Sequence, residues 1–175
     1  MEMHTNGKPK LILNPRIGPR ERFWPASRVA DLLQKCQQDY GFEIWIIAGT
    51  ADQDYVKKIA ECMGGERLNT ISLLELEKLG EILRLGSLFI GPDNGTSRLA
   101  ASLGVPTIVL FGATRPSEWT IPSTAHVEII CKAVNCSPCS LQEKLTCRTR
   151  HCFTDISIEE VIYKVKKLVS YGVGH

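Results

Sequence analysis

The residues best suited to chemistry lie in the run DNGTSR, residues 93–98, which follows the apolar segment SLFIGP. Gly95 would let a backbone approach a ligand closely, and the hydroxyl groups of Thr96 and Ser97 can donate hydrogen bonds. A helix that begins near Gly95 would also present unsatisfied amide groups and a partial positive charge. Together these features predict a cradle for a pyrophosphate group.

Two carboxylates stand at comparable places in the chain. Asp93 ends the apolar segment before the run, and Asp52 follows a second apolar segment, FEIWIIAG. If both segments are parallel strands, both carboxylates lie at the edge of the sheet where ligands bind. Asp93 would then face the ligand or orient the amides of the helix, and Asp52 would bond a ribose hydroxyl. Both are also typical of helix caps that bind no ligand, so the local pattern leaves two interpretations open.

The best-known nucleotide-binding signatures do not occur in the sequence. No GxGxxG follows the first apolar segment, and the chain contains no Gly-Lys-Ser or Gly-Lys-Thr. These absences argue against a dinucleotide-dependent dehydrogenase and against a P-loop phosphotransferase.

Four of the seven cysteines lie close together near the C-terminus. Two residues separate Cys136 from Cys139, and four residues separate Cys147 from Cys152. Four thiolates can form a tetrahedral zinc shell, for which His151 is an alternative ligand. Such a zinc site would be structural, because four protein ligands leave no open position. Reduced thiols and disulfide bonds are the alternatives, and disulfide bonds rarely persist in the cytoplasm.

Strand-like and helix-like segments alternate along the chain and would position these side chains. We predict six strands, over residues 10–15, 42–49, 66–72, 87–92, 107–112 and 126–132. We predict helices over residues 24–41, 51–65, 73–86, 96–104 and 157–172, with Ser-x-x-Glu capping boxes at Ser72–Glu75 and Ser157–Glu160. The alternation indicates an α/β fold with a Rossmann-like, doubly wound parallel sheet and helices on both faces.

Length and composition indicate a globular protein. The 175 residues are 43% hydrophobic and 23% charged, which is typical of one domain. We assign residues 1–9 to a flexible tail and residues 10–175 to a single domain. A net charge of +2 is too small to indicate a nucleic-acid partner. No window of about 20 apolar residues and no signal-peptide pattern occurs, so we expect a cytoplasmic protein without an integral membrane segment.

The segment GPDNGTSRLAASLGVPTIVLFGATRPSEW, residues 91–119, resembles the signature of the C-terminal domain of glycosyltransferase family 9, the heptosyltransferase-like enzymes. That signature is Asp-Ser/Thr-Gly-x-x-His-Leu-Ala-Ala-x-x-Gly, then a Pro-Thr strand, then Phe-Gly-x-Thr-x-Pro. The positions that fit it are Asp93, Gly95, Leu99, Ala100, Ala101, Gly104, Pro106, Thr107, Phe111, Gly112, Thr114 and Pro116. The segment RFWP, residues 22–25, matches the place of the family's Lys-x-Trp-Pro motif. The resemblance spans the chain from Lys10 onward.

The resemblance implies a donor-binding half of the two-domain glycosyltransferase B architecture. These enzymes transfer a sugar from a nucleoside-diphosphate donor, often ADP-heptose, with inversion and without a metal cofactor. It also implies that the N-terminal acceptor domain, which carries the family's catalytic base, is missing here. We therefore expect a nucleotide-sugar-binding domain that is inactive alone. Synthesis of lipopolysaccharide or another cell-surface polysaccharide would place it peripherally at the inner face of the inner membrane.

Two positions depart from the family pattern. Arg22 stands where the family has a lysine that neutralises the donor phosphates, and Arg98 stands where it has a histidine. Both changes keep or add positive charge, so we expect anion binding to survive while the preferred sugar or nucleotide differs. The alternative function is a non-catalytic α/β interaction module, stapled by its cysteines, that has lost nucleotide binding.

Overall fold

The computed structural model describes residues 7–16, 24–71, 76–119, 126–140 and 146–172. Its strands form one sheet in the order β3-β2-β1-β4-β5-β6, and all neighbouring strands are parallel. The strands are β1 (Lys10–Leu13), β2 (Glu43–Ile47), β3 (Asn69–Ile71), β4 (Leu88–Pro92), β5 (Thr107–Phe111) and β6 (Val127–Cys131). The chain builds outward from β1 to one edge and then from β4 to the other, so the predicted doubly wound parallel sheet is confirmed.

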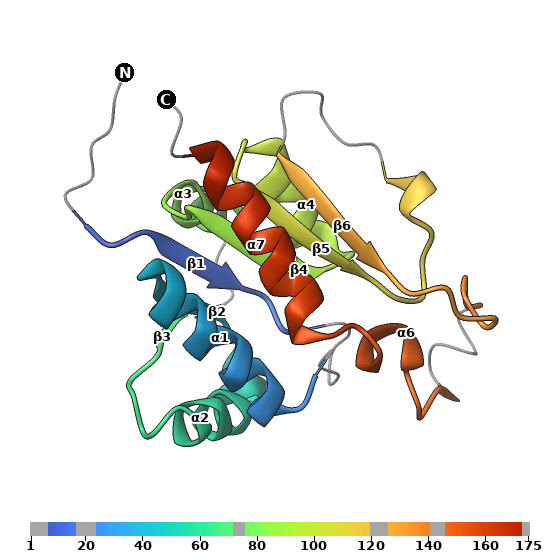
Figure 1. Ribbon diagram of the computed structural model, residues 1–175, viewed down its shortest axis with the longest axis horizontal. Coiled ribbons are helices and arrows are strands. Elements are labelled where there is room, and N and C mark those ends of the chain that lie inside the picture. Colours follow the sequence, from blue (N-terminus) through green and yellow to red (C-terminus); the bar gives the residue numbers. More distant parts are fainter. Residues whose placement is uncertain (1–6, 17–23, 72–75, 120–125, 141–145, 173–175) are drawn as a thin grey trace.

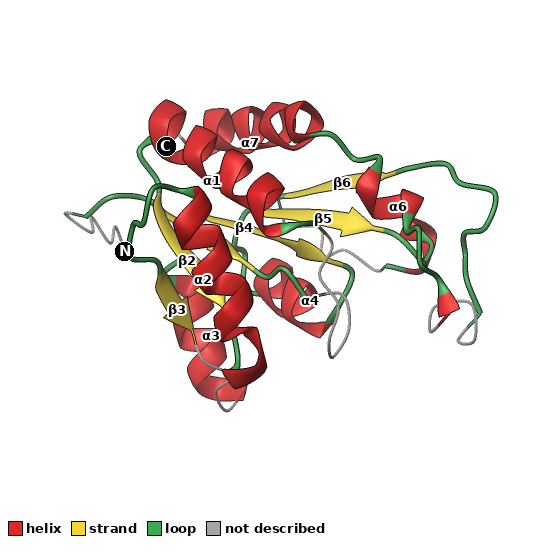
Figure 2. Cartoon of the chain, turned by 90° about the horizontal axis from the view of Figure 1, so that it is seen from below, coloured by secondary structure: helices red, strands yellow, loops and turns green. Residues whose placement is uncertain are grey.

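Helices cover both faces of this sheet, as Figures 1 and 2 show. One face carries α1 (Ala26–Tyr40), α2 (Gln53–Cys62) and α7 (Ile158–Gly172). The other face carries α3 (Leu76–Arg84) and α4 (Gly95–Ser102). Three short helices complete the described part of the chain: η1 (Thr50–Asp52), η2 (Pro116–Glu118) and α6 (His151–Thr154). None of the helices in these described ranges is long and apolar enough to cross a membrane.

The core is divided by the sheet, because successive side chains on a strand point to opposite faces. The first core lies beneath α1, α2 and α7, and β1 contributes Leu11 and Leu13 to it. The second core lies beneath α3 and α4, and the same strand contributes Ile12. A smaller third core gathers around Phe111 and Trp119. Every residue of β4 and β5 is buried, as expected for central strands covered on both faces.

Local sequence signals explain where several helices begin and end. Pro25 precedes the first residue of α1, and Gly41 ends that helix with a φ of 69°, which favours glycine. The predicted capping box of α7 is confirmed: the Glu160 amide donates to the Ser157 hydroxyl, and the Ser157 amide donates to the Glu160 carboxylate. The predicted box at residues 72–75 and the first six residues of the predicted tail lie outside the described residues.

Candidate ligand-binding site at the carboxyl edge of the sheet

The carboxyl ends of β1 and β4 lie side by side at the point where the winding of the sheet reverses. The chain after β1 leads to α1 on one face, and the chain after β4 leads to α4 on the other. Ligands of open α/β sheets bind in the crevice at such a switch point. Of the four buried polar side chains in the described residues, Asn14, Asp52 and Ser97 lie at this edge. The candidate site is therefore built on a fixed polar network.

Asn94 caps the helix that the sequence placed near Gly95. Its side-chain oxygen accepts a hydrogen bond from the Ser97 amide at 3.1 Å, and its backbone oxygen accepts one from the Arg98 amide at 3.2 Å. The Ser97 hydroxyl is buried and donates to the carbonyl of Pro92 at 2.6 Å. Ser97 thus holds the turn together. The predicted contact between its hydroxyl and a pyrophosphate ligand stays a prediction.

The first two backbone amides of α4 lack the hydrogen bonds to Asn94 that the next two make. No hydrogen bond to the amides of Gly95 and Thr96 is found among the described residues. No atom of the described residues lies within 4 Å of a Cβ atom built on Gly95, so these residues leave the space beside Gly95 open. Two unsatisfied amides at the positive end of a helix are an anion-binding arrangement.

Asp93 connects the ends of β4 and β5. One carboxylate oxygen accepts a hydrogen bond from the Thr114 hydroxyl at 2.7 Å, and the other accepts one from the Arg98 guanidinium at 3.2 Å. That guanidinium also lies over the ring of Trp119, 5.3 Å from its centre. The Arg98 side chain is 49% exposed, whereas that of Asp93 is 10% exposed. Arg98 is therefore an oriented, accessible cation beside the start of α4.

Asp52 lies in η1, after β2, and is fully buried. One of its carboxylate oxygens accepts a hydrogen bond from the Gly49 amide at 2.7 Å and lies 3.5 Å from the Arg16 guanidinium. The backbone of Arg16 is fixed on both sides, since its amide donates to Asn14 and its carbonyl accepts from the Asn94 side chain. The bond to Gly49 closes the turn of η1, whereas the side chain makes no capping hydrogen bond to α2 among the described residues. The predicted ribose contact stays a prediction.

Arg22 lies outside the described residues, so its predicted role stays a prediction. Trp24, which follows it closely, is buried and donates a hydrogen bond from its indole to the carbonyl of Phe153 at 2.9 Å. Arg28 lies over the Trp24 ring and donates to the carbonyls of Thr154 and Ile156 at 2.6 and 2.5 Å. The beginning of α1 therefore anchors α6 and the residues that follow it.

The cysteine-bearing segments rest on the carboxyl end of β5. The Ser137 hydroxyl donates to the carbonyl of Gly112 at 2.7 Å, and the Cys139 amide donates to the carbonyl of Ala113 at 3.0 Å. The Phe153 ring packs directly against Gly112, so a Cβ atom there would overlap it. These segments thus support the loop that places Thr114 against Asp93.

All seven cysteines are described, and none of them forms a disulfide bond. Burial raises the pKa of the Cys152 thiol to about 11, with further contributions from Cys139, Cys136 and Cys147. Hydrogen bonds from backbone amides, first that of Arg150, lower the pKa of Cys147. Yet no group of three or more His, Cys, Asp or Glu side chains within the described ranges is arranged to hold a metal ion. The predicted zinc site stays a prediction.

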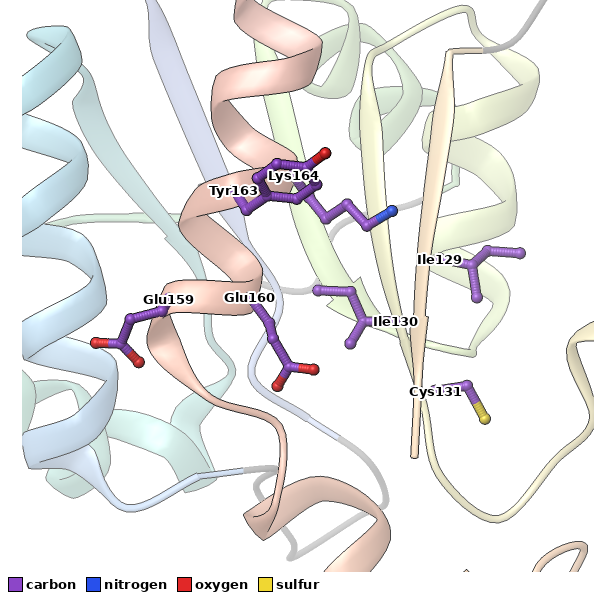
Figure 3. Close-up of a pocket in the computed structure, with 7 residues that line it drawn as sticks. All are labelled: Ile129, Ile130, Cys131, Glu159, Glu160, Tyr163 and Lys164. Carbon is purple, nitrogen blue, oxygen red and sulfur yellow. The ribbon is translucent and has the colours of Figure 1, made fainter. Parts of the chain in front are cut away.

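A cavity of about 490 Å³ lies away from the switch point, between the edge strand β6 and α7. Figure 3 shows Ile130 pointing toward α7, while Ile129 points to the other side of the strand. Of the charged residues that line it, Glu160 pairs with Lys132 and Lys164 pairs with Glu128, and the third, Glu159, is acidic. Its lining therefore offers less to an anionic ligand than the carboxyl edge does.

Comparison with known proteins supports the resemblance. Lipooligosaccharide heptosyltransferase 2 of Campylobacter jejuni is 28% identical over 171 residues, which are 93% of this chain and 52% of that protein. The chain thus spans about half the length of the curated relatives it matches.

Solved structures show the same fold. ADP-heptose lipopolysaccharide heptosyltransferase II of E. coli superposes with a TM-score of 0.73 at 16% identity, over 97% of this chain and 49% of that chain. TibC of enterotoxigenic E. coli is an iron-containing heptosyltransferase that was solved with ADP-D-β-D-heptose. It superposes with a TM-score of 0.68 at 14% identity, over 94% of this chain and 46% of the TibC chain. The model of the family described as glycosyltransferase family 9 (heptosyltransferase) matches residues 2–149 of this chain. Since this match covers well over half of the sequence, the chain belongs to glycosyltransferase family 9.

Proposed function

We propose that the chain is the donor-binding half of an inverting, metal-independent heptosyltransferase of lipopolysaccharide synthesis, and that its ligand is a nucleoside-diphosphate sugar, with an ADP-sugar favoured. The observation that carries the proposal is the open start of α4 at the switch point, where the amides of Gly95 and Thr96 have no partner among the described residues. Family membership and the fold agree with it. TibC, with the same fold, was solved with ADP-D-β-D-heptose.

The charges at the carboxyl edge suit a departing diphosphate. In sugar transfer the bond from the anomeric carbon to the diphosphate oxygen breaks, and negative charge develops on that oxygen. The start of α4 and the Arg98 guanidinium would stabilise this charge, because both are fixed in place before the reaction. Asp93 would act by holding Arg98 and Thr114. In this proposal the chain itself supplies the positive charge that a metal ion supplies in other transferases.

The acceptor hydroxyl needs a base and a binding surface, which we assign to the half of such an enzyme that this chain does not match. The chain covers 52% of the length of the C. jejuni relative, so half of such a protein has no counterpart here. The acceptor hydroxyl, deprotonated by a base in that half, would attack the anomeric carbon from the face opposite the diphosphate. The chain alone should therefore bind the donor without transferring its sugar. A peripheral location at the inner membrane stays a prediction from the resemblance.

The test is calorimetric titration of the chain with ADP, UDP and GDP. We expect saturable binding with ADP preferred, and we expect Gly95→Val to weaken it at least about tenfold, because the new side chain projects into the open space before α4. The valine side chain fits this space without a clash, so the thermal midpoint of Gly95→Val should match that of the wild type. Gly80→Ala, a glycine substitution in α3 with room for a Cβ, serves as the matched control and should bind ADP normally.

Two results would oppose the proposal. Binding of ADP that is unchanged in Gly95→Val would move the donor away from the start of α4. A folded chain that binds no nucleoside diphosphate at millimolar concentration would support the non-catalytic interaction module instead. Because a ligand that binds only the native state raises its stability, a thermal shift with each nucleotide gives an independent readout.

A structural zinc ion at Cys136, Cys139, Cys147 and Cys152 remains a separate proposal. Their spacing supports it, whereas the described side-chain positions support reduced thiols. Elemental analysis of the purified chain decides between them, and zinc at one equivalent would support the site. Metal-free protein in which these four thiols all react would contradict it. Iron is measured in the same assay, because TibC is an iron-containing protein of the same fold.

A further inference from the structure

We propose that Arg16 is an additional phosphate-binding residue of the site, and that Asp52 is a positioning residue that acts through it. The ligand class is a diphosphate. This inference rests on the proposed function, because it places the same diphosphate at the same switch point. It adds a cation that the sequence analysis did not assign to the site, and it gives the buried carboxylate of Asp52 a role other than contact with a ribose.

The position of Arg16 is fixed by the same residue that caps α4. The Asn94 side chain accepts a hydrogen bond from the Ser97 amide with its oxygen and donates one to the carbonyl of Arg16 with its nitrogen, at 3.1 and 3.2 Å. On the other side, the Arg16 amide donates to the buried Asn14 side chain at 3.1 Å. A single amide group thus connects the chain after β1 to the start of α4.

The Arg16 side chain is oriented by a buried charge. The Asp52 carboxylate is fully buried, is held by the Gly49 amide, and lies 3.5 Å from the Arg16 guanidinium. The Arg16 side chain keeps 21% of its surface exposed, so one part of it faces the buried carboxylate and another part faces solvent. A guanidinium has five N–H donors in a planar arrangement, so it can pair with a carboxylate and still contact a phosphate.

The positive groups around the switch point suit a diphosphate ligand, which carries more than one negative charge, better than a ligand with a single carboxylate. Arg16 lies after β1, and Arg98 lies in the first turn of α4. Asn94, which caps α4, bonds the carbonyl of Arg16, and the first two amides of the helix have no partner among the described residues. Both guanidiniums are oriented by a carboxylate, Asp52 for one and Asp93 for the other. Two preoriented cations with a helix N-terminus form a site for two linked phosphates.

The experiment separates a ligand contact from a structural role with two single variants and their combination. Arg16→Met removes the guanidinium, Asp52→Asn removes the buried charge while keeping an acceptor for the Gly49 amide, and the double variant removes both charges together. Arg84→Met, at an exposed position near the end of α3, is the matched control. Each protein is measured for its thermal midpoint and is titrated with inorganic pyrophosphate, ADP and adenosine.

Arg16→Met should lower the thermal midpoint, because it removes the cation beside a buried carboxylate. The double variant should recover most of that loss. Pyrophosphate and ADP should nevertheless bind at least about tenfold more weakly to both Arg16→Met and the double variant, since a charge-assisted hydrogen bond is lost. Adenosine, which has no phosphate, should bind equally to the wild type and the double variant. The control should match the wild type throughout.

Wild-type affinity for pyrophosphate in the double variant would overturn the inference, because Arg16 would then serve only to neutralise Asp52. A wild-type chain that does not bind pyrophosphate would overturn it as well. Failure of the proposed function gives a different result. In that case pyrophosphate binding depends on Arg16, but ADP, UDP and GDP bind no more tightly than pyrophosphate. This result would remove the nucleotide-sugar assignment and would still support the phosphate-binding role of Arg16.

Discussion

Gly112 is the residue at which the cysteine-bearing region meets the sheet. It follows the last residue of β5, and the Phe153 ring occupies the space where a side chain would lie. Its carbonyl accepts a hydrogen bond from the Ser137 hydroxyl. The cysteine-bearing region therefore contacts both the backbone of Gly112 and the space that a side chain would fill. A close approach of this kind requires glycine for steric reasons rather than for backbone freedom.

We predict that Gly112→Ala destabilises the chain by about 1–3 kcal/mol, because the methyl group forces Phe153 or β5 to shift. Urea denaturation followed by circular dichroism measures the change. Gly80→Ala is the matched control: its Cβ atom would lie 3.9 Å from its nearest neighbours, so it should raise stability by about 0.5–1 kcal/mol through helix propensity. Equal effects of the two substitutions would contradict the assigned role of Gly112.

Sequence reasoning located the start of α4 but did not assign every residue around it. It placed the anion-binding turn at residues 93–98, where the structure has the start of α4. It did not separate Asp93 from Asn94, because both types cap helices, and only the structure shows Asn94 as the cap and Asp93 bonded to Arg98. Arg16 was not singled out, because its orientation depends on Asp52, which is distant in sequence and comes close only through the sheet.

At the scale of elements, α7 is attached to the edge strand β6 by ion pairs. Glu128 on β6 lies 2.7 Å from the Lys164 ammonium and 2.5 Å from that of Lys167. A third pair joins Lys132, just after the strand, to Glu160 at 2.6 Å. Burial raises the pKa of Glu128, but the hydrogen bonds from its two lysines outweigh it, and the net pKa lies below the ordinary value. The carboxylate is therefore favoured in the folded state.

We predict that Glu128→Gln lowers stability by about 1–2 kcal/mol at pH 7, and that this deficit shrinks in acid. A depressed folded-state pKa contributes stability above the unfolded-state value of about 4.3 and loses it as the pH falls through the folded-state pKa. The gap in thermal midpoint between wild type and variant should thus stay constant from neutral pH to about pH 5 and narrow below about pH 4.

The control for this prediction is Glu81→Gln, an exposed carboxylate on α3 for which the structure gives no ion pair among the described residues. Its thermal midpoint should follow the wild type across the same pH range. A Glu128→Gln deficit that stays constant down to pH 3 would assign the loss to packing of the side chain rather than to its charge.

Elements were easier to predict than the contacts between them. The alternation of segments gave all six strands, although β3 covers only Asn69–Ile71 rather than residues 66–72. The capping box of α7 was visible because its two residues are three apart in the chain. The pairing of Glu128 with lysines on α7 depends on how the helix crosses the edge strand, which no local pattern specifies. For the same reason, the attachment of α6 to Trp24 and Arg28 was not anticipated.

At the scale of the whole molecule, the sheet couples three cores that lie on its two faces. β4 contributes Leu88 and Ile90 to the first core and Phe89 to the second. β5 contributes to the first core and, through Val109 and Phe111, to the third. Because the same strands line both faces, disrupting one core displaces the side chains of another. The described part of the chain should therefore unfold as one cooperative unit.

The three tryptophans allow this prediction to be tested core by core, since Trp24 belongs to the first core, Trp45 packs against the second and Trp119 belongs to the third. Three variants, each keeping one tryptophan and carrying phenylalanine at the other two positions, are unfolded in urea. Within each variant the fluorescence midpoint should coincide with the midpoint from circular dichroism, even though the variants differ in stability. An earlier transition confined to the Trp119 variant would show that the third core opens alone, and the loop that fixes Arg98 would then loosen before the sheet does.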